Sequence, residues 1–382
     1  MTVFQPIVGS VLAWAIQDGN YDASRLDYEL GFKGALTSWI TGESQPNKGQ
    51  LTKIARRLGR PESFFYLPEP PHSSQKSAKY RQFAGTTKFP GSDTQNGLRN
   101  ATLLQKTARW VRSETAEPKV AFPKLSTQTT PELAAERLRK WLGWRLSHQT
   151  ASPDYQGIAV AKALRGKLED KQILVLHLSL DEEVTRGFSL SDEFAPLLAV
   201  NTKDDYKPRV FSYVHELAHL ALGEGAVCDV HEDDDAVEKF CNRTAAAFLM
   251  PEEDFRGHVL KRLRGRQVAT LDDVAAIRGR YRVSLRAAAI RAENLGLASW
   301  GLYDRVDQNA ELKSGGGGGG QPGNERTKSR IRVDQYGRQF IHTVEAGVNA
   351  GVLRQAQAAE LLRISNREWT EVLALSHSGL VG

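Results

Sequence analysis

Helical periodicity dominates the beginning of the chain. Apolar residues recur at three- and four-residue intervals in segments that begin near Val11, Leu36 and Leu51. This spacing predicts amphipathic helices. A proline-rich run at residues 67–71 follows. Because proline cannot continue a helix, we expect a helical domain over residues 1–72.

The middle of the chain mixes helical and strand patterns. Helical spacing covers residues 97–113, 131–145 and 153–168, and short β-like segments occupy 173–176, 187–190 and 196–200, of which the first is an apolar run. Apolar runs of this length between turn signals are typical of buried strands. We therefore predict an α+β fold that is mostly helical and contains a small sheet.

A glycine-rich segment separates the end of the chain from the rest. Ser314 is followed by six consecutive glycines and then Gln321-Pro322-Gly323, a composition typical of flexible linkers. Helical spacing returns over residues 340–375, and residues 356–373 suggest a helix-turn-helix-like module. The predicted segments are a helical domain (1–72), a basic helical connector (73–152), a central domain (153–300), a linker (301–329) and a C-terminal helical module (330–382).

Length and composition favour a cytoplasmic protein. With 382 residues the chain is too long for one compact core. Its two cysteines, Cys228 and Cys241, cannot form a disulfide framework, which favours a reducing compartment. No run approaches the roughly 18 apolar residues of a membrane helix. We expect a soluble protein with no membrane partner.

The net charge of +6 is unevenly distributed. Residues 1–72 hold seven basic and seven acidic side chains, whereas residues 76–112 hold eight basic side chains and one acidic. Residues 256–291 hold ten basic and two acidic side chains, and residues 229–238 contain six carboxylates. The two basic segments suit an anionic partner, but the neutral first domain lacks the positive surplus that supplies DNA affinity.

One motif indicates catalytic chemistry. His215-Glu216-Leu217-Ala218-His219 lies within a helical apolar pattern. Residues four positions apart share a helix face, so His215 and His219 can bind one metal ion. Glu216 follows the first histidine, where its carboxylate can act as a general base on a water molecule.

A catalytic zinc site needs a third protein ligand. Glu238 begins a second helical pattern that ends at Pro251, and we predict it as the third ligand beside His215 and His219. Asn242, one turn later, would orient a ligand histidine. Zinc suits this ligand set best, and manganese or iron could use similar ligands.

A different ligand set stays open. Cys228, His231 and Cys241 are alternative ligands, and they would make a closed structural zinc site that leaves Glu216 without a role. An enzyme of this type also needs an electrophile to stabilise the transition state. The candidates are Tyr213, His231 and Arg243.

The order of these motifs resembles the ImmA/IrrE family of zinc metallo-endopeptidases. The resemblance rests on residues 209–219, the acidic loop and residues 238–251, and it covers about residues 150–300. It implies a zincin-like core of the gluzincin type, with His215, His219 and Glu238 as ligands and Glu216 as the catalytic base. Family members cleave transcriptional repressors that control phage, mobile-element or stress-response genes. We therefore expect a repressor or antitoxin of the helix-turn-helix class as substrate.

The first domain resembles the XRE-type helix-turn-helix domain, a module often fused ahead of these peptidases. Its recognition helix would cover residues 35–40, with Lys33, Thr37 and Ser38 facing outward. Ile40 stands where that family usually has an acidic residue. Together with the neutral charge, this favours docking of a similar helical repressor over strong DNA binding.

A second helix-turn-helix-like pattern covers residues 271–295. Arg282 and Arg286 are its candidate DNA contacts, and Arg278, Arg280 and Arg291 add to its charge. The simpler interpretation is a solvated helix face beside the zinc domain.

Three functions follow from these patterns. The leading hypothesis is a zinc endopeptidase that cleaves a specific repressor or antitoxin. The alternative is a DNA-binding transcriptional regulator or antitoxin whose metal site is structural or vestigial. A general degradative protease is the third, but that function would not require helix-turn-helix-like modules.

Overall fold

The fold is given by a computed structural model that describes residues 4–19, 21–70, 92–154, 156–180, 185–223, 234–299, 301–302 and 327–378. The chain divides into two compact units. One comprises Met1–Leu103 and Ser179–Thr185, and the other comprises Leu104–Leu178 and Arg186–Gly382. Each unit is described separately below.

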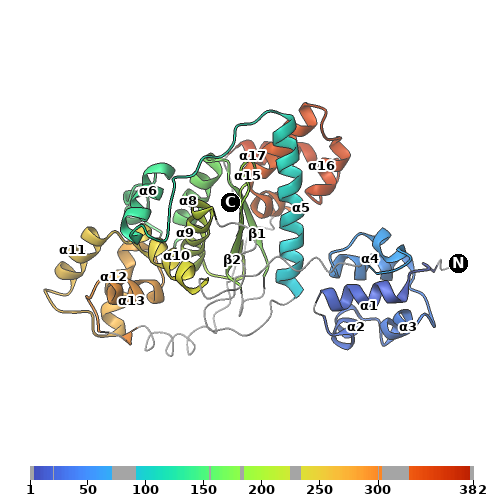
Figure 1. Cartoon of the computed structure of the whole chain (residues 1–382), viewed down its shortest axis with the longest axis horizontal. Helices are drawn as coiled ribbons and strands as arrows, with labels where there is room; N and C mark the ends of the chain where they lie inside the picture. The colour runs from blue at the N-terminus through green and yellow to red at the C-terminus, as the bar shows by residue number, and fades with distance from the viewer. Residues whose placement is uncertain are drawn as a thin grey trace. The chain divides into compact units, whose positions relative to one another are not determined.

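The first unit is helical, as its sequence predicts (Figure 1). Its elements are α1 (Gly9–Asp18), α2 (Ala23–Leu30), α3 (Ala35–Thr41), α4 (Lys48–Arg57), the 3₁₀ helix η1 (Glu62–Tyr66) and the beginning of α5 (Ser92–Glu114). Leu12, Leu36, Trp39 and Ile54 form part of its buried core. The apolar periodicity therefore placed these helix faces correctly.

The start of α3 is fixed by a buried carboxylate. Asp27 accepts hydrogen bonds from the backbone N–H groups of Gly34 (2.5 Å) and Leu36 (2.8 Å), which satisfies donors that a helix start leaves without partners. Lys33 and Thr37 are exposed beside this start, and Ser38 is half-buried. The expected helix over residues 35–40 is confirmed, and Lys33 and Thr37 face outward as predicted.

The second unit is built on a three-stranded sheet. Its strands are β1 (Leu174–Leu178), β2 (Gly187–Leu190) and β3 (Leu197–Asn201), which match the three predicted runs. The order is β1-β3-β2, with β1 parallel and β2 antiparallel to β3. Every residue of β1 and β3 is buried, which explains why their sequences are continuously apolar rather than alternating.

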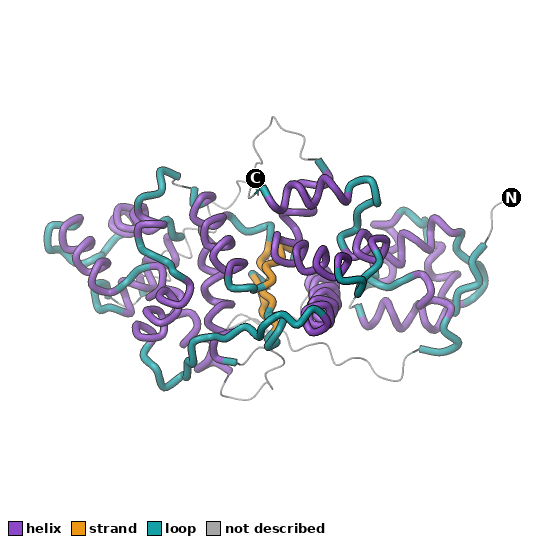
Figure 2. Tube along the Cα trace, turned by 90° about the horizontal axis from the view of Figure 1, so that it is seen from above, coloured by secondary structure: helices purple, strands orange, loops and turns teal. Residues whose placement is uncertain are grey.

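Helices cover both sides of this sheet. Figures 1 and 2 show α8 and α9 on one side of the strands and α15 with α17 on the other. The helices of the second unit are the end of α5, α6 (Pro131–Leu142), α7 (Ser147–Thr150), α8 (Ile158–Asp170), α9 (Tyr206–Leu222), α10 (Asp234–Leu249), α11 (Glu252–Arg262), α12 (Leu271–Tyr281), α13 (Leu285–Asn294), α15 (Lys328–Asn349), α16 (Gln355–Leu361) and α17 (Trp369–His377). The mostly helical α+β class is confirmed.

The two compact units do not follow the expected segments, and two helices show the difference. Helix α6, assigned to the connector over 73–152, packs against α10 and contributes Ala134 and Leu138 to the main core. Helix α15, assigned to a separate C-terminal module, packs along β1 in the same unit. Local periodicity could not predict these contacts, because they join residues far apart in the chain.

The helix pair α12 and α13 belongs to the main core. Arg282, a predicted DNA contact, is buried and donates to the backbone carbonyls of Gly279 and Ser152. Arg291 is also buried and pairs with Glu132 at 2.9 Å. Arg282 is therefore a structural residue in this fold, and the prediction that it reaches DNA was wrong. Arg286 is exposed.

No helix in the described part of the chain is both long enough and apolar enough to cross a membrane.

Candidate active site

Helix α9 carries the predicted metal-binding histidines. It packs against α8, α10, β2 and β3, and its buried residues include Val210, Leu217 and Ala218. It ends at Leu222 and is followed by Gly223, whose positive φ of 75° is the left-handed conformation that glycine adopts at helix ends. The apolar flanks of the motif therefore bury the helix from several directions and fix its position.

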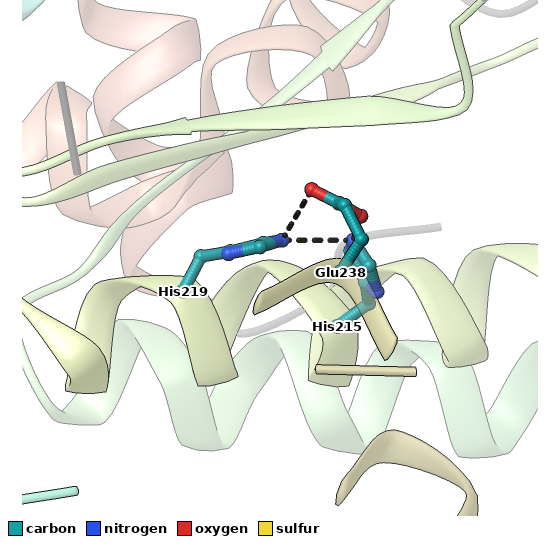
Figure 3. A group of neighbouring side chains, drawn as sticks. All are labelled: His215, His219 and Glu238. Carbon is teal, nitrogen blue, oxygen red and sulfur yellow. Dashed lines mark hydrogen bonds and ion pairs between the residues drawn. The ribbon is translucent and has the colours of Figure 1, made fainter. Parts of the chain in front are cut away.

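The three predicted ligands converge (Figure 3). His215 Nε2 and His219 Nε2 lie 3.0 Å apart. Glu238, from α10, places Oε2 at 3.3 Å from His215 Nε2 and Oε1 at 3.3 Å from His219 Nε2. These residues form a group whose ligand atoms all lie within 4.8 Å of one another. Two helices that meet across the core therefore bring together two imidazoles and one carboxylate.

The donor set fits a bound divalent metal. Two neutral imidazole nitrogens and a carboxylate oxygen are ligands that zinc accepts. Only 1% of the His219 side-chain surface is exposed, whereas 15% of His215 and 16% of Glu238 are exposed. The group is therefore anchored at His219 and partly open at His215 and Glu238. A catalytic metal requires such an open side, and a closed structural site does not.

Glu216 faces the edge strand β2. A Cβ added to Gly187 in β2 would lie 3.4 Å from Glu216 Oε1 and 2.7 Å from the carbonyl oxygen of Ala199. Glycine at position 187 therefore lets the strand pass beside this carboxylate. Glu216 is 6% exposed and is not a member of the ligand group found among the described residues.

The helix that carries the site lies within a segment that resembles a known peptidase family. Residues 168–293 match the Peptidase_M78 family, described as the IrrE N-terminal-like domain. This M78 segment includes β1, β2, β3, α9 and α10, and with them the whole ligand group. The match supports the resemblance to the ImmA/IrrE family and a peptidase role with a protein substrate. No curated protein matches the chain.

The residue beside His219 differs from the one predicted. Asn242 is exposed on α10. The contact to His219 comes from the preceding residue, Cys241, whose Sγ lies 3.2 Å from His219 Nδ1. Cys241 therefore approaches the ring nitrogen opposite the one that faces Glu238, and it is not part of the converging group.

The predicted electrophiles occupy different places. Tyr213 is buried, and its hydroxyl lies 2.5 Å from His177 Nε2 on β1. Burial raises the pKa of this phenol. Arg243 is exposed on α10. His231, together with the alternative ligand Cys228, lies outside the described residues.

Sequence reasoning missed His177. It sits in the middle of an apolar strand, where a single polar residue signals a buried hydrogen bond. Burial and the nearby Arg165 guanidinium lower the pKa of His177 to about 4, so the ring is neutral at pH 7. Two groups lie beside its Nδ1: the Asp334 carboxylate on α15 at 3.1 Å and Arg165 Nη1 on α8 at 3.3 Å.

Proposed function

We propose that this protein is a zinc-dependent endopeptidase. The observation that carries the proposal is the convergence of His215, His219 and Glu238 within a segment similar to the M78 peptidases. A zinc ion held by these side chains would polarise a peptide carbonyl and make water more acidic. This ligand set also supports zinc over a harder cation that prefers only oxygen ligands.

Glu216 is the proposed general base. It follows the first ligand on the same helix, so its carboxylate can take a proton from the attacking water and return it to the leaving amine. Its position beside Gly187 on the edge strand β2 supports a substrate that passes along this strand. His219, the most buried member of the group, holds the ligand set in place.

The proposed substrate is a helix-turn-helix repressor or antitoxin, and cleavage would release phage, mobile-element or stress-response genes. The first unit would bind this substrate through the exposed start of α3, where Lys33 and Thr37 are accessible. The equal numbers of basic and acidic residues over 1–72 support a protein partner over DNA.

The test of the proposed activity is a cleavage assay. The purified protein is mixed with candidate repressors in the presence of zinc or a chelator, and cleavage is followed by mass spectrometry. We expect Glu216→Gln to abolish cleavage but keep the metal, and Glu238→Ala to lose both. If Glu216→Gln cuts the same repressor at the wild-type rate, the proposed base is wrong.

The metal content tests the ligand set separately. Protein purified without added metal is analysed for zinc, manganese and iron, with Glu238→Ala beside the wild type. If Glu238→Ala keeps its full zinc content, the third ligand must be sought among Cys228, His231 and Cys241.

The alternative function is DNA-binding regulation with a structural metal site. It requires accessible basic side chains. Arg286 is exposed, but Arg280 pairs with Asp254 and Arg291 is buried and pairs with Glu132. Gel shifts with the wild type and with Lys33→Ala separate the two functions. A complex that weakens steeply with salt, and weakens further in Lys33→Ala, would favour the regulator.

A further inference from the structure

A chain of hydrogen bonds joins the C-terminal helices to the back of the metal-binding helix. The Tyr213 hydroxyl on α9 lies 2.5 Å from His177 Nε2 on β1. His177 Nδ1 lies 3.1 Å from Asp334 Oδ1 on α15. Tyr213 and His177 are buried, so water does not compete freely for these bonds. Three elements that are distant in sequence are linked through three side chains.

One tautomer of His177, with the proton on Nδ1, gives this chain a consistent polarity; Arg165 Nη1 also lies 3.3 Å from Nδ1. A neutral imidazole offers one N–H donor and one acceptor nitrogen. In this tautomer the Asp334 carboxylate, which can only accept, accepts the N–H of His177 Nδ1. The unprotonated Nε2 then accepts the hydroxyl proton of Tyr213. Each of the three groups is satisfied without an added charge on the ring.

Hydrogen bonds and ion pairs around Asp334 join α15 to α8 and β1. Val175 on β1 turns its carbonyl away from β3, and this oxygen accepts a hydrogen bond of 3.0 Å from Arg165 Nη2. The same guanidinium bonds the backbone carbonyl of Asp334 at 2.7 Å and the Glu169 carboxylate at 3.2 Å. Arg338 on α15 pairs with Glu169 at 3.2 Å. Alternating charges therefore fix the position of α15 against the outer edge of β1.

Gly337 shows how closely α15 approaches this edge. Its backbone departs from helical geometry, with φ 74° and ψ 156°. A Cβ at this position would lie 2.8 Å from the carbonyl oxygen of Val175 and would also meet the Glu169 carboxylate. Residues 327–378 therefore cover the outer edge of β1, whose backbone groups would otherwise be exposed.

The position of Tyr213 makes this link relevant to the metal centre. Helical residues are rotated by about 100° each, so Tyr213 and His215 point in nearly opposite directions from α9. The histidines face Glu238, while the phenol anchors the opposite side of the same helical turn. An anchor there restrains both the roll of the helix and its movement along its axis.

We propose that residues 327–378 position the metal-binding helix through Asp334, His177 and Tyr213. The proposal rests on the proposed metal centre. The three side chains are positioning residues, because they hold the helix and do not touch the metal. Their loss would broaden the range of His215 and His219 positions and weaken metal binding.

The test is a double-mutant cycle that measures zinc affinity. Zinc alone is titrated into the full-length apoprotein against a chromogenic chelator, with Tyr213→Phe, Asp334→Ala and the double variant. Outer partners of metal ligands are worth roughly 10- to 100-fold in affinity. Because this link is one step more distant, we expect about a tenfold loss in each single variant. The double variant should be no weaker than the weaker single variant, because both break one chain.

Hydrogen exchange gives an independent readout. We expect the α9 amides around His215 to lose protection in both single variants. Lys328→Ala is the matched control, because Lys328 also lies on α15 but pairs with Glu368 at the surface. It should leave both zinc affinity and α9 protection at wild-type values.

Several results would overturn the proposal. The proposal would be wrong if folded Tyr213→Phe bound zinc within twofold of the wild-type affinity. This substitution removes only the hydroxyl that contacts His177. Additive losses in the double variant would show two independent packing effects. If the wild type itself binds no zinc, the proposed metal centre fails, and hydrogen exchange at α9 still decides whether the positioning link exists.

Discussion

Removal of the Cys241 thiol should weaken metal binding without abolishing it. Cys241 Sγ lies 3.2 Å from His219 Nδ1, while Nε2 of the same ring faces Glu238. If Nδ1–H donates to the sulfur, Nε2 is left unprotonated and able to bind a metal. The thiol would thus select the tautomer of His219 and fix the orientation of its ring.

The size of the effect follows from the chemistry of this contact. Outer partners of ligand histidines are worth roughly 10- to 100-fold in metal affinity. A thiol sulfur is a weak acceptor, so we expect Cys241→Ala at the lower end, a loss of about tenfold or about 1.4 kcal/mol. The small cavity should also lower the free energy of unfolding by about 1 kcal/mol. Cys241→Ser restores an acceptor and should recover most of the zinc affinity.

The assay is a competition titration of zinc against a chelator under reducing conditions. Thr244→Ala is the control, because Thr244 is buried on the same helix one turn later and its loss should reduce stability only. Wild-type affinity in Cys241→Ala would refute the positioning role. Complete loss of zinc in both Cys241→Ala and Cys241→Ser would refute it in another way, by showing that the sulfur is a ligand.

Three further predictions concern stability. Gly337→Ala should lower the free energy of unfolding by about 1–3 kcal/mol, because position 337 has a positive φ and no room for a Cβ. Gly257→Ala, in open space on α11, is the control and should not lower it. Equal urea midpoints for the two variants would contradict this prediction. The pKa of His177 is about 4 in the folded protein and about 6.5 in the unfolded chain, so the unfolded chain is protonated at higher pH. The free energy of unfolding should therefore be highest above about pH 6.5 and fall by up to about 3 kcal/mol as the pH drops to 4. Urea unfolding of His177→Gln should show a flatter pH dependence over this window, and parallel curves would exclude the effect. Arg282→Ala should destabilise the second unit through its lost carbonyl contacts and leave any DNA complex unchanged in gel shifts.

Local pattern was sufficient to place the elements and to predict that His215 and His219 lie side by side. Apolar sequence predicted the buried strands β1 and β3, and Leu198 and Val200 lie in the main core as such strands require. His215 and His219 share a face because helix geometry leaves no other arrangement. The choice of Glu238 depended on a second helix whose packing against α9 the sequence could only suggest.

The outer contacts of the site were not predictable from local pattern. Cys241 and Asn242 lie three and four positions after Glu238, so both lie near the same face of α10. The sequence does not show which of the two side chains contacts His219. Arg282 illustrates a second difficulty. Its charge suggested a surface position, but the side chain is buried and donates to the backbone carbonyls of Gly279 and Ser152.

The largest departure concerns the C-terminal helices. A glycine-rich linker normally separates independent modules, yet Asp334 and Arg338 pair with buried groups on β1 and α8. A buried ion pair adds little net stability when it is intact, but loss of one partner costs several kcal/mol because the other charge is left buried. Separation of residues 327–378 from the sheet would remove Asp334 from Arg165 and Arg338 from Glu169, and would leave these two buried groups with only each other as partners. The glycine-rich segment therefore joins two parts of one compact unit, and truncation after the M78 segment should destabilise the second unit.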